Sequence, residues 1–152
     1  MPDVVAELDC SAIFMGVKTM IELYSTNVET TENMIVTWDK KSLQIGNTAT
    51  LSADKQTINL NAPGVYRVHV NAYGSTDAAG TFGFQLQGNG VDIVRGASSQ
   101  GTGTTVVDAA VAFETNVRVM NAPAYERATI ALEYTGSVGN LKLIDIIVER
   151  VR

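Results

Sequence analysis

The chain has 152 residues, and its 11 lysine and arginine residues against 16 aspartate and glutamate residues give a formal net charge of −5 at pH 7. It contains 18 valine, 10 isoleucine and 16 threonine residues, and such β-branched side chains favour strands over helices. Charged residues make up 18% of the chain, fewer than the roughly 25% of an average soluble domain. We therefore expect one β domain, part of whose surface is covered by other subunits.

The composition also excludes several classes of protein. The apolar runs are far shorter than the roughly 20 residues that span a bilayer. The acids Asp3, Glu7 and Asp9 precede the first base, Lys18, which is the wrong charge for a secretory signal. An acidic chain without a cluster of bases offers no footprint for nucleic acid. The lone Cys10 cannot pair within the chain, which indicates assembly in a reducing compartment.

The first half of the chain moves from an ambiguous segment to clear strands. Residues 1–19 keep neither the helical nor the strand period, so a helix over Val4–Cys10, a strand over Ala12–Met15, or both remain open. From Met20 the residues alternate as in a strand, a polar loop covers 27–33, and another strand is expected over 34–38. Pro63–Gly64 fits the central pair of a type II turn.

The strongest strand signals follow that turn. Apolar residues alternate with polar ones from Tyr66 to Ala72, which is typical of a half-buried strand. Asn89–Gly90 lies between two more alternating segments and predicts a type I′ hairpin over residues 81–95. Residues 96–105 (GASSQGTGTT) are small and predict a mobile loop. One long strand or two are expected over 106–119, and further strands over 129–134 and 141–151.

Eight to ten short strands and no amphipathic helix after residue 20 favour an antiparallel sandwich or barrel. The last strand is apolar on both faces, with Ile144, Ile146 and Val148 on one face and Leu141, Leu143, Ile147 and Val151 on the other. Such a strand lies against the core on one side and against something else on the other. A β-bulge near Leu143–Ile144 is the alternative, and the low charge content leads us to favour a subunit interface.

The order of these segments resembles a known family. Ile58 and Leu60, the run Pro63–Val68 and the hairpin Phe84–Val91 look like the small jelly-roll proteins of bacterial viruses, and the likeness extends from about Met20 to Val151. Those proteins are similar in turn to the trimeric heads of the first complement component and of tumour necrosis factor. Related members often carry a cysteine-rich turn where this chain has Asn121–Arg127, which contains no cysteine.

The resemblance implies an antiparallel β-sandwich of the jelly-roll type, a homotrimer, and a last strand close to a three-fold axis. It also implies that the core contains Tyr66, Val68, Val70, Phe84, Leu86, Ile130 and Leu132. The phage members suggest a head fibre or decoration protein on the outer capsid. We assign residues 1–19 to a docking segment and residues 20–152 to the jelly-roll domain.

No residue pattern points to an enzyme. His69 is the single histidine and lacks a second nitrogen or sulfur ligand nearby for zinc, and Cys10 shows no activating partner. Weak calcium binding by loop carboxylates is conceivable, and the acids in question are Glu29, Glu32, Asp39, Asp77 and Asp92. The aromatic residues Trp38, Tyr24 and Tyr73 could form a platform for a sugar, although such residues more often belong to a core or an interface.

We therefore predict a non-enzymatic virion structural protein without a cofactor, assembled in the host cytoplasm and fixed to the capsid exterior as a homotrimer. Its expected partners are the major capsid protein or another capsid component. The candidate trimer-interface residues are Ile147, Val151, Leu143 and Tyr134, and the candidate capsid-docking residues are Val4, Val5, Leu8, Ile13 and Phe14. The alternative is a receptor- or glycan-binding head of a fibre that uses the loops Gly96–Thr105 and Asn121–Arg127. We expect neither nucleic acid nor membrane as a partner.

Overall fold

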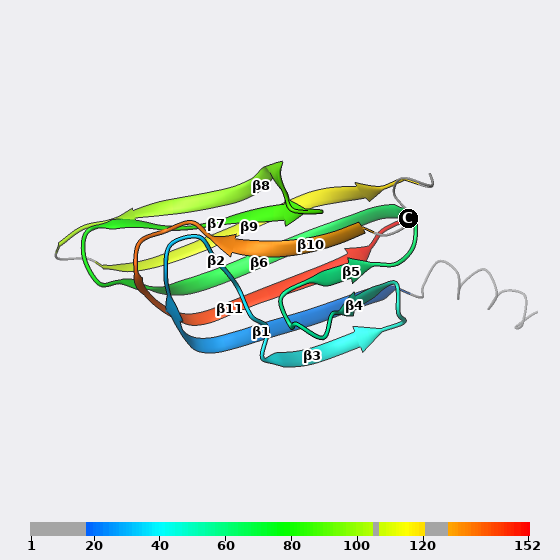
Figure 1. Cartoon of the computed structure of the whole chain (residues 1–152), viewed down its shortest axis with the longest axis horizontal. Helices are drawn as coiled ribbons and strands as arrows, with labels where there is room; N and C mark the ends of the chain where they lie inside the picture. The colour runs from blue at the N-terminus through cyan, green and yellow to red at the C-terminus, as the bar shows by residue number, and fades with distance from the viewer. Residues whose placement is uncertain (1–17, 105–106, 121–127) are drawn as a thin grey trace, which may run out of the picture.

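The computed structural model describes residues 18–104, 107–120 and 128–152. Its eleven strands form two antiparallel sheets stacked face to face, with the strands along the long axis of the molecule (Figure 1). The strands are β1 Thr19–Thr30, β2 Met34–Ile35, β3 Lys40–Ile45, β4 Ala49–Leu51, β5 Ile58–Leu60, β6 Gly64–Thr76, β7 Gly80–Gly88, β8 Val91–Thr102, β9 Asp108–Val119, β10 Ala128–Tyr134 and β11 Gly139–Arg150. The all-β fold class is thus confirmed.

One sheet has five strands in the order β3-β1-β11-β6-β9, and the other has the order β4-β5-β10-β7-β8 with β2 paired to β10. Strands β1, β11 and β6 are aligned at one end of the first sheet. Thr19 at the start of β1 pairs with Arg150 at the end of β11, and Arg150 pairs with Tyr66 near the start of β6. The chain therefore enters β1 and leaves β11 at the same end of the sandwich (Figure 1). Within the described residues there is no helix of the length and apolarity needed to cross a membrane.

The core lies between the sheets and uses the alternation read from the sequence. All seven expected core residues are at most 1% exposed: Tyr66, Val68, Val70, Phe84, Leu86, Ile130 and Leu132. Phe82, Phe84 and Tyr134 pack edge to face with ring centroids 5.4 to 5.8 Å apart, an arrangement that aromatic rings prefer. Burying each large apolar side chain stabilises the fold by about 1.5 to 3 kcal/mol.

The Asn89–Gly90 hairpin is confirmed, since the two residues have φ values of 51° and 81°, as a type I′ turn requires. The hairpin is longer than predicted, however. Residues 96–102 belong to β8 and pair with β7, for example Ser99 with Gly83. The expectation of a loop beginning at Gly96 is therefore wrong. Main-chain pairing with β7 places these residues in a strand, and their side chains are too small to produce the alternation that would have predicted it.

The type II turn at Pro63–Gly64 is also wrong. Gly64 does have a positive φ, at 144°, but the Val65 N–H donates to the carbonyl oxygen of Arg152 instead of closing back onto Ala62. The Ala62 carbonyl accepts the Tyr66 hydroxyl at 2.6 Å instead. A Cβ at Gly64 would lie 2.1 Å from the Arg152 oxygen, so glycine is needed here for the close approach of the chain end.

Candidate functional site

The outward face of the five-stranded sheet is the surface to which the sequence assigned an interface. We define it as the side chains of β1, β11, β6 and β9 that point away from the core. The strand pairing arranges them in rows across the sheet. The rows are Thr26, Leu143, Tyr73 and Ala110; Tyr24, Asp145, Asn71 and Ala112; Glu22, Ile147, His69 and Glu114; and Met20, Glu149, Arg67 and Asn116.

A β-bulge explains why β11 is apolar on both faces. The pairing of β11 with β6 shifts between Leu141 and Leu143, and Asn27, with φ of 55°, lies opposite the same point on β1. The extra residue Lys142 lets Leu141 share the core side with Ile144, Ile146 and Val148, all at most 1% exposed. The bulge alternative is confirmed one residue earlier than expected, and it still leaves Leu143 and Ile147 partly buried on the outward face.

The first row is uncharged and contains a large exposed aromatic side chain. Tyr73 is 50% exposed and stands beside two open hollows of about 440 and 300 Å³. Their lining includes Ala110 and Ala112 of the edge strand β9 and Leu143 of β11. A projecting tyrosine next to a hollow floored by small residues provides the shape and the apolar anchor that protein interfaces use.

The third and fourth rows carry a charged network. The Glu149 carboxylate lies 3.1 Å from Lys18 Nζ and 3.5 Å from Arg67 Nη1, with its side chain only 15% exposed. On β9, Glu114 lies 3.7 Å from His69 Nδ1 and 3.9 Å from Arg67 Nε. Because Glu114 is 54% exposed, we expect its contacts to contribute little stability in water.

Asp145 occupies the centre of the second row, on the middle strand of the sheet. Its Oδ1 accepts a hydrogen bond from Asn71 Nδ2 at 3.4 Å. Burial raises the pKa of the Asp145 carboxyl above its ordinary value of 3.8, and the negative charge of Glu22 adds to this, while Asn71 and His69 oppose it. The outward face therefore has a carboxylate at its centre whose charged form is disfavoured.

The structure removes one residue from the predicted trimer interface. Tyr134 is 0% exposed, and its hydroxyl donates to the Ser137 carbonyl oxygen at 2.5 Å. Its ring packs on Phe82 and Phe84, so Tyr134 belongs to the core of its own subunit and is not exposed for contact with another subunit. Of the other three residues, Leu143 and Ile147 share the outward face, and Val151, 38% exposed, follows β11.

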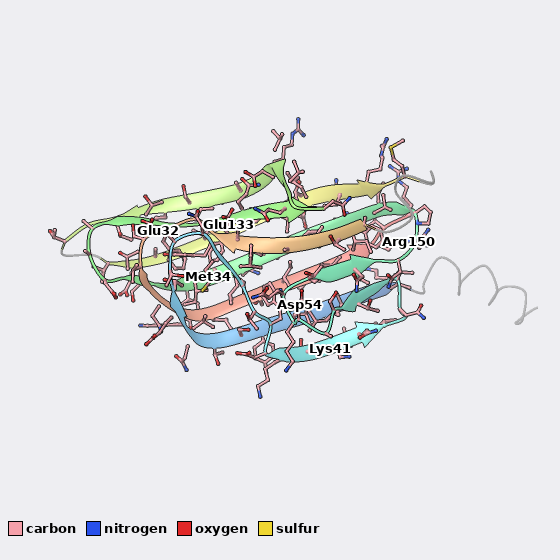
Figure 2. All side chains as sticks on the ribbon, viewed as in Figure 1. Glu32, Met34, Lys41, Asp54, Glu133 and Arg150 are labelled. Atoms are coloured by element: carbon pink, nitrogen blue, oxygen red, sulfur yellow. The ribbon has the colours of Figure 1, made fainter. Side chains whose placement is uncertain are left out.

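The aromatic platform for a sugar is wrong as a set of three rings. Trp38 is 1% exposed and lies in the core, whereas Tyr24 and Tyr73 lie on the outward face on either side of β11. In the described part of the chain, no three histidine, cysteine, aspartate or glutamate side chains gather in a way that could hold a metal ion. Figure 2 shows Glu32, one of the loop acids, at the end of the sandwich opposite Arg150.

Other predicted residues lie outside the described ranges: Cys10, the docking residues Val4, Val5, Leu8, Ile13 and Phe14, and the loop 121–127. Sequence reasoning did not single out Glu22, Asn71 or Asp145. Each was visible only as the polar partner in an alternating strand, and the register between strands is what brings them together.

Comparisons with known proteins rest on structure alone. No family model matches the chain, and a sequence comparison with curated proteins finds no match. Among solved structures, murine APRIL at pH 5.0 matches with a TM-score of 0.66 and 11% identity over 88% of this chain and 98% of that one. PRD1 vertex protein P5 matches with a TM-score of 0.56 and 13% identity over 90% of this chain and 99% of that one.

The Eiger TNF of S. frugiperda gives a TM-score of 0.54 and 14% identity over 86% of this chain and 92% of that one. The same two-sheet arrangement therefore recurs in proteins whose sequences have almost nothing in common with this one. The chain has the jelly-roll fold of the tumour necrosis factor type, as the sequence resemblance predicted, and shares it with a phage vertex protein.

Proposed function

We propose that the chain is a non-enzymatic structural protein of a phage virion, assembled as a homotrimer and fixed to the capsid exterior as a head fibre or decoration protein. The observation that carries the trimer is the outward face, where Leu143 and Ile147 project from the middle strand on either side of Asp145 and Leu143 lies beside the half-exposed Tyr73. Aromatic and aliphatic side chains that project from the middle strands of a sheet face are typical of subunit interfaces. The likeness to a phage vertex protein supports the setting.

The trimer is tested by the mass of the chain in solution. Light scattering on the full chain should give three times the 16.2 kDa of one subunit. A mass of one subunit across a dilution series would overturn the trimer. A dimer would do the same, because a three-fold axis cannot relate two copies.

Attachment to the capsid is assigned to residues 1–19. The first described residues, Lys18 and Thr19, lie at the end of the sandwich where β11 finishes. Because rotation about an axis keeps equivalent atoms in one plane, three subunits would present three docking segments at one level. Each fully buried apolar side chain would contribute about 1.5 to 3 kcal/mol, and three linked segments bind with avidity when they reach their sites together.

Docking is tested with particles that lack the protein. The full chain should bind them, and a chain that begins at Met20 should remain a folded trimer and fail to bind. A full-length variant in which Val4, Val5, Leu8, Ile13 and Phe14 are all serine is the matched control for length, and it should fail as well. Decoration by either variant would contradict the docking assignment.

The alternative function is that of a receptor- or glycan-binding head of a fibre. Two features that suggested this function are absent from the surface loops, because Trp38 is buried and residues 96–102 form part of β8. A glycan array separates the two functions, since saccharide-dependent binding by the trimer would favour the head over passive decoration.

A further inference from the structure

We infer that the interface between subunits is tightened by acid, through protonation of Asp145 at the centre of the outward face. This inference rests on the proposed trimer and names a regulation of that same face. The partner that binds the outward face is a second copy of the chain.

The position of Asp145 follows from the sheet order. β11 is the middle strand of β3-β1-β11-β6-β9, so a side chain that points outward from its middle stands at the centre of the face. In a three-fold assembly, the three copies of any residue lie in one plane around the axis. Three Asp145 carboxylates therefore lie at one level, and they come closest when the centre of the face lies on the axis.

The groups around Asp145 do not neutralise it. On β1, Tyr24 is its direct neighbour and Glu22 is one row away, next to Ile147. On β6, Asn71 donates one hydrogen bond at 3.4 Å, and His69 is one row away. The basic side chains further along the face already have carboxylate partners, because Lys18 and Arg67 contact Glu149, and Arg67 and His69 contact Glu114.

The remaining charged groups lie at the margins. Lys142 of β11 lines the hollow beside Tyr73 and Asp108, Lys40 of β3 is opposite Tyr24 on the far side of β1, and Arg118 lies on the edge strand β9. In the described part of the chain, no salt bridge reaches the Asp145 carboxylate. The two other subunits of a trimer remove more water from this face and add two like charges, and both effects disfavour the ionised form.

The direction of the pH effect follows from proton linkage. The trimer binds protons at Asp145 that the separated subunits release, so lowering the pH drives assembly. Protonation also turns the carboxyl into a donor that can hydrogen-bond to an oxygen of a neighbouring copy. His69 stands beside the Glu114 carboxylate of its own subunit, one row away from Asp145.

The test measures the monomer–trimer equilibrium of the full chain by sedimentation velocity over a dilution series between about pH 8 and about pH 5. The association constant of three subunits should rise by about tenfold or more over this range, because uptake of one proton per trimer changes it by that factor per pH unit. Asp145→Asn should assemble at pH 8 as tightly as the original chain does in acid, and its pH response should be lost.

Three further samples make the result specific. Glu22→Gln should weaken the pH response without abolishing it, and His69→Gln should retain the response. Asp92→Asn, which changes an exposed acid on β8 of the other sheet, should behave as the original chain. A trimer whose association is the same at every pH and in Asp145→Asn would overturn this inference and leave the trimer standing. A chain that is monomeric throughout would overturn both.

Calcium provides the last discriminating condition. Tightening by added calcium at pH 8, without any response to acid, would overturn the inference in favour of a cation held between three carboxylates.

Discussion

Asn71 and Asp145 face each other across β6 and β11, and the Asn71 amide donates a hydrogen bond to the carboxylate at 3.4 Å. The hydrogen bond favours the charged form of Asp145, but burial outweighs it and raises the pKa of the carboxyl above 3.8. A residue that costs stability when ionised lies at the centre of the one face for which the sequence predicted an interface. The pair therefore connects the stability of the subunit with the chemistry of its surface.

Asp145→Asn is expected to stabilise the subunit at neutral pH. Since the folded chain holds the Asp145 proton to a higher pH than the unfolded chain, the ionised residue lowers stability above its folded pKa, and this penalty disappears as the pH falls toward 3.8. Thermal melts should show a Tm about 1 to 2 °C higher for the variant at pH 8. The difference should vanish near pH 4, and a larger difference in acid than at pH 8 would contradict the assignment.

Asn89 should be replaceable by glycine at a smaller cost than by alanine. Its φ of 51° is unfavourable for alanine, and its side-chain oxygen accepts from the Thr129 N–H at 2.9 Å. Asn89→Ala loses both features and should lower the free energy of unfolding by about 2 kcal/mol. Asn89→Gly keeps the turn and should lose about half as much. Urea titration measures both, and equal losses would show that the hydrogen bond alone matters.

Gly83→Ala should destabilise the pairing of β7 with β8. An added Cβ would lie 2.6 Å from the Ser99 Cβ and 3.1 Å from the Ser98 carbonyl oxygen, so the strands must move apart. We expect a loss of about 1 to 3 kcal/mol in urea titration. The double variant with Ser99→Gly removes the first clash and should recover part of the loss, whereas strictly additive losses would argue against a direct contact.

Ile147→Ser and Tyr134→Phe separate the outward face from the core. The first removes an apolar side chain from the centre of the face and should shift the mass of the assembly toward one subunit while the fold remains. The second removes the hydrogen bond to Ser137 and should lower the free energy of unfolding by about 1 kcal/mol without changing the mass. Light scattering and thermal melts on both variants check this, and dissociation by Tyr134→Phe alone would return that residue to the interface.

Local patterns accounted for most of the fold. The alternation from Tyr66 to Val70 reflects the two-residue period of a strand. The pair Asn89–Gly90 predicts a turn because both residues tolerate positive φ. Both signals lie within a short segment of the chain. Segments without a strong pattern were assigned less well. Residues 96–102 have side chains too small to show a period, and their place in β8 comes from pairing with β7.

The sequence by itself determined an all-β sandwich, its buried alternating residues and an apolar last strand, because side-chain period and turn geometry are local properties of the chain. Only the tertiary structure decided that the bulge at Lys142 turns Leu141 into the core and leaves Leu143 and Ile147 outside, and that Tyr134 belongs to the interior. It also brought Glu22, Asn71 and Asp145 together. These residues come from three strands far apart in sequence, and their proximity depends on the register between strands, which no single segment encodes.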